Sequence, residues 1–138
     1  MITKAVILAA GRGTRLQPLT YDLPKPMIPL LGKPVMEYIV EHLARQGVRE
    51  IMVNTSHLAH RIEQYFGDGR RFGVRIGYSF EGHVEHGQAV PEPVGSAGAL
   101  RRIHDLGGFI DDTTAVLCGD AVVGIDLRVA AARHRAQS

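Results

Sequence analysis

The sequence predicts a single α/β domain with a Rossmann-like, three-layer αβα architecture and a mostly parallel sheet. Short apolar runs typical of buried strands alternate along the chain with segments whose apolar residues recur at helical spacing. Glycines follow several of these runs, as they do where a chain turns sharply after a strand. The 138 residues, 45% of them hydrophobic and 22% charged, are enough for one domain with its own core.

The first predicted strand covers residues 5–8 and leads into a turn with two glycines. Gly11 and Gly13 have no side chain and can adopt unusual backbone angles, so successive N–H groups can converge on an anionic oxygen. Arg12 and Arg15 add positive charge. The dinucleotide fingerprint needs a third glycine that is absent here, and no G-x-x-x-x-G-K-[ST] string occurs. The turn is therefore neither of these two common nucleotide-binding motifs. It indicates either a phosphate site of another kind or an ordinary bend in the chain.

The proline-rich segment 15–33 predicts an ordered, extended connection laid over the end of the first strand. Lys25 lies within it between Pro24 and Pro26, which restrict its backbone. Such restriction would hold the ammonium group over a fixed point. A solvent-exposed lysine in a loop is the ordinary alternative.

Four further elements follow from periodicity. A helix is expected over residues 34–46, opened by a proline and closed by a glycine, and a second buried strand over 51–53. An amphipathic helix is expected over 58–66. Residues 74–80 alternate between apolar and polar, which predicts a strand toward the edge of the sheet.

The remaining chain begins with an expected irregular loop over residues 82–94, long enough to be functional. A helix over 95–103, a third buried strand over 115–118 and a helix over 126–134 complete the pattern. Asp120 comes just after the third strand, at the edge where open α/β sheets bind ligands. Capping of a turn is the alternative role for this aspartate.

Several motifs in order resemble the sugar-1-phosphate nucleotidylyltransferases, also called sugar-nucleotide pyrophosphorylases. The matching stretches are Leu8-Ala-Ala-Gly-Arg-Gly-Thr-Arg-Leu16, Pro18-Leu19-Thr20, Pro24-Lys25-Pro26-Met27, Lys33-Pro34 and Gly95-Ser96-Ala97-Gly98-Ala99-Leu100. The resemblance implies the nucleotide-diphospho-sugar transferase type of fold, and a reaction in which an NTP and a sugar 1-phosphate give an NDP-sugar and pyrophosphate. It also implies Mg²⁺ as cofactor.

The resemblance assigns roles to particular residues. Arg15 would contact the leaving β- and γ-phosphates, and Lys25 the α-phosphate or the sugar phosphate. Asp120 would bind Mg²⁺, although Cys118 replaces the asparagine that commonly precedes this Gly-Asp pair in the family. The base would lie against backbone near Ala9 to Gly11 and near Gly95. The nucleotide-binding residues are expected to be Leu8, Ala9, Ala10, Gly11, Gly13, Thr14, Arg15 and Gly95.

General likeness over residues 38–80 favours the mannose-1-phosphate guanylyltransferase type and therefore a purine, guanine first. Several relatives that use uridine or thymidine read the pyrimidine with a glutamine shortly before the G-x-A segment. Gln88 lies seven residues before Gly95 in the expected loop, so this role is not assigned to it. A nucleotide-binding fragment or regulatory module without turnover is the alternative function.

The chain is expected to be incomplete at its C-terminal end, where relatives add much of the sugar pocket and a second metal-binding aspartate. An uncovered apolar face is then expected, which favours self-association into homo-oligomers or a disordered end after about Asp126. On the same ground, the 138 residues alone should bind nucleotide but turn over poorly.

Composition excludes several partners. The net charge is only +2 with scattered arginines, so no nucleic-acid partner is predicted. No apolar run approaches about 20 residues, so no membrane partner is predicted and a cytoplasmic location is expected. The single Cys118 agrees with a reducing compartment. The pairs His57/His60 and His83/His86 lack further ligands at zinc-site spacing and are interpreted as surface histidines.

Overall fold

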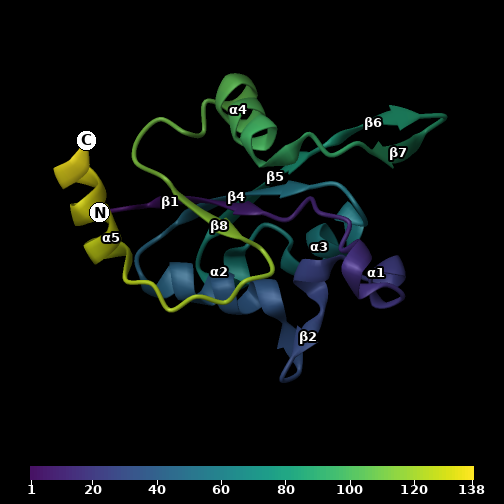
Figure 1. Ribbon diagram of the computed structural model, residues 1–138, viewed down its shortest axis with the longest axis horizontal. Coiled ribbons are helices and arrows are strands. Elements are labelled where there is room, and N and C mark those ends of the chain that lie inside the picture. Colours follow the sequence, from purple (N-terminus) through teal and green to yellow (C-terminus); the bar gives the residue numbers. More distant parts are fainter.

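The computed structural model describes residues 1–138 and is built around a parallel sheet of four strands in the order β5-β4-β1-β8 (Figure 1). These strands are β1 (Lys4–Leu8), β4 (Glu50–Thr55), β5 (Arg75–Phe80) and β8 (Ala115–Cys118). Their register pairs Leu8 with both Asn54 and Cys118. The carboxyl ends of the three strands therefore meet at one edge of the sheet, which is where the predicted ligand residues follow.

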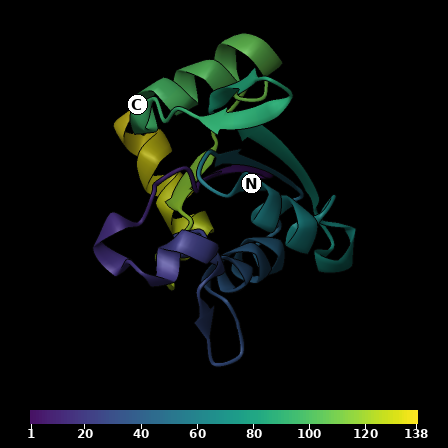
Figure 2. The same cartoon turned by 90° about the vertical axis from the view of Figure 1, so that its right-hand side faces the viewer.

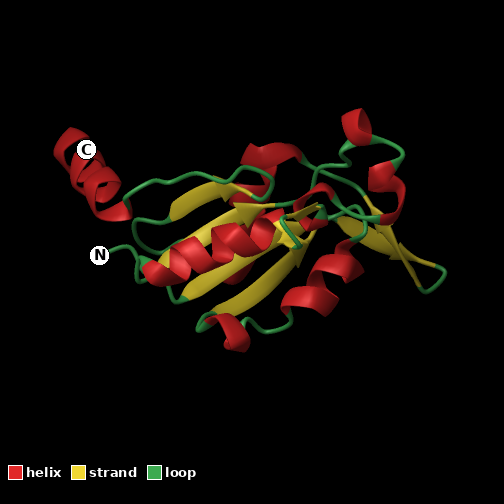
Figure 3. Ribbon diagram, turned by 90° about the horizontal axis from the view of Figure 1, so that it is seen from below, coloured by secondary structure: helices red, strands yellow, loops and turns green.

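Helices cover both faces of this sheet, so the predicted three-layer αβα architecture is confirmed (Figure 2). On one face lie α2 (Val35–Arg45) and α3 (Ala59–Phe66), and α4 (Gly95–Gly107) covers the other. Seen from below, α2 runs along the strands (Figure 3). The predicted helices over 34–46 and 58–66 are thus confirmed, and the helix predicted over 95–103 extends one turn further.

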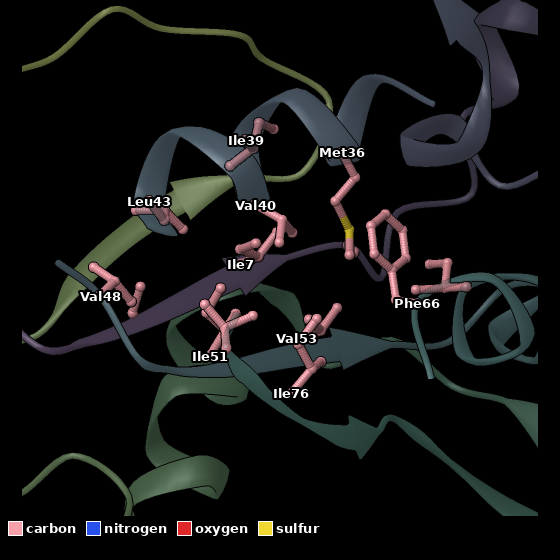
Figure 4. Close-up of a cluster of buried hydrophobic side chains, with 14 of the residues drawn as sticks. Ile7, Met36, Ile39, Val40, Leu43, Val48, Ile51, Val53, Phe66 and Ile76 are labelled. Atoms are coloured by element: carbon pink, nitrogen blue, oxygen red, sulfur yellow. The ribbon is translucent and has the colours of Figure 1, made fainter. Parts of the chain in front are cut away.

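The core lies between the sheet and the helices α2 and α3 (Figure 4). Met36, Ile39, Val40 and Leu43 recur at helical spacing, so one face of α2 is buried against the sheet. Alternate residues of the strands face them, because side chains of a strand point to opposite sides. The larger core residues from the strands are Ile7, Ile51, Val53 and Ile76.

Residues 82–91 form a β-hairpin, so the prediction of an irregular loop over 82–94 was wrong for all but its last three residues. The hairpin consists of β6 (Gly82–Glu85) and β7 (Gln88–Pro91) and projects beyond the carboxyl end of the sheet (Figure 1). His86 and Gly87, the two residues between the strands, have φ angles of 50° and 77°. Positive angles at both positions suit a tight hairpin turn, but histidine at the first is not a typical signal for it.

The strand β8 lies at an edge of the sheet. The prediction that it is a buried strand was therefore wrong. Its residues alternate between half-buried and exposed, and Val116 is 46% exposed. An apolar run of four residues does not distinguish an edge strand from a central one, because neighbours in the sheet decide the burial. The other edge strand is β5, as predicted.

The segment between β1 and α2 forms short helical turns rather than the extended connection that was predicted. It contains 3₁₀ turns at Thr14–Leu16 and Lys25–Met27 and the one-turn helix α1 (Leu19–Asp22). A small hairpin of β2 (Pro29–Leu30) and β3 (Lys33–Pro34) follows. Proline fixes φ near the helical value, so it fits the first positions of such turns as well as extended chain.

The C-terminal residues form helix α5 (Leu127–Gln137), so the alternative of a disordered end after Asp126 was wrong. The Asp126 carboxylate accepts hydrogen bonds from the backbone N–H groups of Val129 and Arg128, which lower its pKa. Gln46, which follows α2, accepts a hydrogen bond from the Leu127 N–H at 2.6 Å. None of the helices is both long and apolar enough to cross a bilayer.

An apolar groove of about 460 Å³ lies between β8 and α5, and 11 of its 14 lining residues are hydrophobic. The uncovered apolar face expected from the sequence is therefore present at this edge of the sheet. Self-association through it stays a prediction.

Candidate functional site

A cavity of about 420 Å³ lies at the carboxyl ends of the parallel strands. Every site residue predicted from the sequence lines it. These residues are Leu8, Ala9, Ala10, Gly11, Gly13, Thr14, Arg15, Lys25, Gly95 and Asp120. They come from segments up to 112 positions apart, and the parallel register of β1 and β8 brings them together.

The glycine turn has one position with a positive φ angle. Gly13 has a φ of +63°, and a Cβ there would lie 2.7 Å from the Thr20 side chain, so only glycine fits without a shift. Gly11 has no positive φ, so only one of the two glycines that can adopt such angles does so. Nothing lies within 4 Å of the place where its Cβ would be. Its lack of a side chain therefore leaves open space in the cavity.

Two polar side chains from outside the stretch Leu8–Leu16 fix the position of this turn by hydrogen bonds. The buried Thr20 donates a hydrogen bond from its hydroxyl to the Gly13 carbonyl oxygen at 2.7 Å. His57 contacts the Thr20 carbonyl oxygen through Nε2 at 2.7 Å, and because a carbonyl only accepts, Nε2 carries the proton. The interpretation of His57 as a surface histidine was therefore wrong. Its contact with residue 20 spans 37 positions, which spacing in the sequence does not reveal.

The two arginines of the turn differ in position. Arg15 lines the cavity, but Arg12 does not and is exposed. Of the two arginines, only Arg15 therefore adds charge to the cavity wall. Opposite it, Gly95 opens α4 with a φ of +80° and lines the cavity with Ser96. The start of α4 therefore forms part of the cavity wall.

The two other charged residues predicted for the site pair with each other. Nζ of Lys25 lies 2.7 Å from Oδ2 of Asp120, and their side chains are 43% and 32% exposed. An ion pair this exposed contributes little to stability. Each side chain can therefore leave its partner and bind a ligand instead, with little loss of folding free energy. Lys25 would then face an anion and Asp120 a cation.

The fit of Mg²⁺ to this site depends on Asp120. The structure has no group of three or more His, Cys, Asp or Glu side chains that could hold a metal ion. Mg²⁺ is commonly bound by one or two carboxylates together with phosphate oxygens and water. Asp120 on the cavity wall fits this second arrangement, in which the nucleotide supplies part of the shell.

Comparison with known proteins identifies the chain's family. The model of the nucleotidyl transferase family matches residues 4–138. The chain belongs to the nucleotidyl transferase family. It is 56% identical to the UTP–glucose-1-phosphate uridylyltransferase of Synechocystis and 35% identical to the mannose-1-phosphate guanylyltransferase of Mycobacterium tuberculosis. The alignments cover 96% and 95% of this chain but only 34% and 33% of those relatives.

Solved structures agree with this membership. HddC from Yersinia pseudotuberculosis, complexed with GMP-PN, superposes with a TM-score of 0.76 at 28% identity. The match covers 96% of this nucleotidyl transferase chain and 54% of HddC. A UDP-glucose pyrophosphorylase complexed with UDP-glucose shares the fold with a TM-score of 0.73. The chain thus spans from about a third to about half of the length of these relatives. The resemblance to sugar-1-phosphate nucleotidylyltransferases is confirmed.

Sequence reasoning missed two buried residues in the wall of this nucleotidyl transferase cavity, Asn54 and Glu81. They are 3% and 1% exposed. Asn54 is the second-last residue of the strand β4, and Glu81 follows β5 directly. A polar run after an apolar strand, here Asn54-Thr55-Ser56, is the signal that could have pointed to the first of them. Gln88, by contrast, is exposed on the hairpin and does not line the cavity.

Proposed function

We propose that the protein containing this chain transfers a nucleotidyl group from an NTP to a sugar 1-phosphate and releases pyrophosphate. One observation carries the proposal: a single cavity gathers the glycine turn, Arg15, Lys25 and Asp120 at the carboxyl edge of the sheet. Membership in the nucleotidyl transferase family supports it.

The chemistry follows from the charges. A sugar-phosphate oxygen attacks the α-phosphorus of the NTP, the bond to the β-phosphate oxygen breaks, and negative charge builds on the leaving pyrophosphate. Such a reaction needs alignment and charge neutralisation rather than a covalent nucleophile. Arg15 would neutralise the leaving phosphates, and Lys25 would hold the α-phosphate or the sugar phosphate. The backbone N–H groups of the glycine turn would add further donors.

Mg²⁺ is part of the proposal. When bound, the ion supplies charge neutralisation at the phosphate oxygens. Asp120 would hold it as a carboxylate ligand, and Lys25, released from that carboxylate, would turn to the phosphates. Both members of the ion pair thus gain a new partner when Mg²⁺ and nucleotide enter together.

UTP and glucose 1-phosphate are our first candidate substrates. The support is the 56% identity to the Synechocystis uridylyltransferase, well above the 35% to the mycobacterial guanylyltransferase. GTP with mannose 1-phosphate is the second candidate, the one that the sequence alone favoured. One feature of the cavity supports it, since its wall contains no glutamine of the kind that reads pyrimidines in several relatives.

The test is pyrophosphate release with a panel of NTPs and sugar 1-phosphates, using the chain extended through its natural downstream sequence. We expect release to require both substrates and Mg²⁺ and to be fastest with UTP and glucose 1-phosphate. The 138-residue chain should bind nucleotide but turn over more slowly, because misplaced reactants lose several kcal/mol of barrier reduction, on the order of 10²-fold or more in rate. Release from no pair of substrates by the extended protein would contradict the proposal.

Arg15→Ala should raise the dissociation constant for Mg²⁺-NTP about tenfold or more. A charge-assisted hydrogen bond typically contributes at least about 1.5 kcal/mol, which is close to a factor of ten in affinity. Arg12→Ala is the matched control, since it removes the same charge from the same turn but from outside the cavity. Isothermal calorimetry measures both. Equal affinities for Arg15→Ala and Arg12→Ala would show that Arg15 does not contact the phosphates.

A further inference from the structure

The buried pair Asn54 and Glu81 links the two walls of the cavity. The Ala9 N–H, at the start of the glycine turn, donates to Oδ1 of Asn54 at 2.6 Å. Nδ2 of Asn54 donates to Oε1 of Glu81 at 2.8 Å. The Val94 N–H, just before α4, donates to Oε2 of Glu81 at 3.1 Å. One chain of three hydrogen bonds therefore connects the glycine turn to the first residues of α4.

The direction of these bonds makes a carboxylate necessary at position 81. The backbone N–H groups at both ends of the chain can only donate, so Asn54 must present its oxygen to Ala9 and its amide nitrogen to Glu81. Glu81 then receives a donor on each of its two oxygens. A glutamine there would place its own N–H group against another donor, whichever way it turned.

Both partners of this buried carboxylate are neutral N–H groups, so its charge is not cancelled by a cation. An anionic phosphate chain would avoid this part of the cavity. The cations Arg15 and Lys25 lie in the rest of the lining. The nucleoside part of the ligand therefore belongs between the walls that Asn54 and Glu81 join, and the phosphates belong on the glycine turn.

We infer that Glu81 is a positioning residue, which acts through Asn54 and Val94 to set the separation of the two walls that enclose the nucleoside. This inference rests on the proposed function, because it needs a nucleotide in the cavity. The role is electrostatically specific. It requires that both side-chain oxygens of residue 81 accept a hydrogen bond and that the side chain of residue 54 donates one of these bonds.

The test uses the full-length protein and three variants. Glu81→Gln forces two donors together, and Asn54→Asp forces two acceptors together. The double variant Asn54→Asp/Glu81→Gln reverses the inner bond, because the new amide donates to the new carboxylate while Ala9 and Val94 keep their acceptors. Glu92→Gln is the matched control, since Glu92 is an exposed carboxylate on the same segment and does not line the cavity.

Dissociation constants are measured for Mg²⁺-UTP, Mg²⁺-GTP and Mg²⁺-tripolyphosphate. Consider whichever of UTP and GTP the wild type binds more tightly. Each single variant should bind this nucleotide roughly tenfold more weakly than the wild type does, which is the usual scale for one buried mismatched hydrogen bond. The double variant should return to within about threefold of the wild type. Tripolyphosphate has no nucleoside, so all variants should bind it within about twofold of the wild type. This last measurement also shows that the single variants are folded.

Three results would overturn the inference. One is unchanged nucleotide affinity in both single variants. Another is an equal loss of affinity for nucleotide and tripolyphosphate, which would indicate general damage to the site. The third is a double variant that binds no better than the single ones. A different result would contradict the proposed function, and with it this role of Glu81. In that case the wild type would bind UTP and GTP no more tightly than it binds tripolyphosphate.

Discussion

Lys25→Ala is expected to lower turnover of the full-length protein by about 100-fold or more, the scale seen when one donor aimed at developing charge is removed. The ammonium group of Lys25 lies on the cavity wall, and its nearest charged partner is the Asp120 carboxylate, which it would exchange for phosphate. No other lysine lines the cavity. The loss should therefore appear mainly in kcat, measured as the rate of pyrophosphate release at saturating substrates.

Stability should change little in this variant. The Lys25–Asp120 pair is partly exposed, and pairs of this kind contribute about 0–1 kcal/mol. Lys33→Ala is the matched control, since Lys33 pairs with Glu41 at 2.9 Å away from the cavity lining. If Lys25→Ala and Lys33→Ala turned over at the same rate, the assignment of Lys25 to the reacting phosphates would be wrong.

Phe66→Ala should lower the free energy of unfolding by about 3–5 kcal/mol, the range for removal of a buried aromatic side chain. Phe66 is 2% exposed and is the last residue of α3. Its ring meets the Tyr65 ring edge-on at a centroid distance of 5.0 Å and lies 5.5 Å from the Phe72 ring. Because it joins α3 to the residues before β5, its removal leaves a cavity that the surroundings cannot easily fill.

Urea denaturation followed by circular dichroism measures this loss. Domains are typically stable by about 5–15 kcal/mol, so a loss of this size is a large fraction of the total and lowers the urea midpoint clearly. Leu31→Ala is the control, since Leu31 is an apolar residue that is 94% exposed. A loss for Phe66→Ala below about 1 kcal/mol would mean that the core around α3 repacks and is not held by this ring.

The pattern of apolar residues was sufficient to predict the elements that build the sheet and its covering. The strands β1 and β4 and the helices α2 and α3 were all predicted, because their burial follows a period that the sequence displays. The motif from Leu8 to Leu16 and the aspartate after β8 indicated which residues would meet. The cavity lining contains all of them except Arg12.

Other features depended on the tertiary structure, because they are set by which segments become neighbours. Strand order left β8 at an edge, so the same four apolar residues that read as buried are half-exposed. The hairpin over 82–91 exists because its strands pair with each other. The contact of Asn54 with Ala9 spans 45 positions, and that with Glu81 spans 27.

The sequence by itself therefore determined the local periodicity, the family resemblance and the place of Arg15, Lys25 and Asp120 at the carboxyl edge of the sheet. Only the tertiary structure decided that Arg15 and not Arg12 faces the cavity, and that Glu81 joins its walls. The physical reason is that periodicity reports which face of an element is buried. The partner of a buried polar group depends on strand register and on the path of the chain between strands.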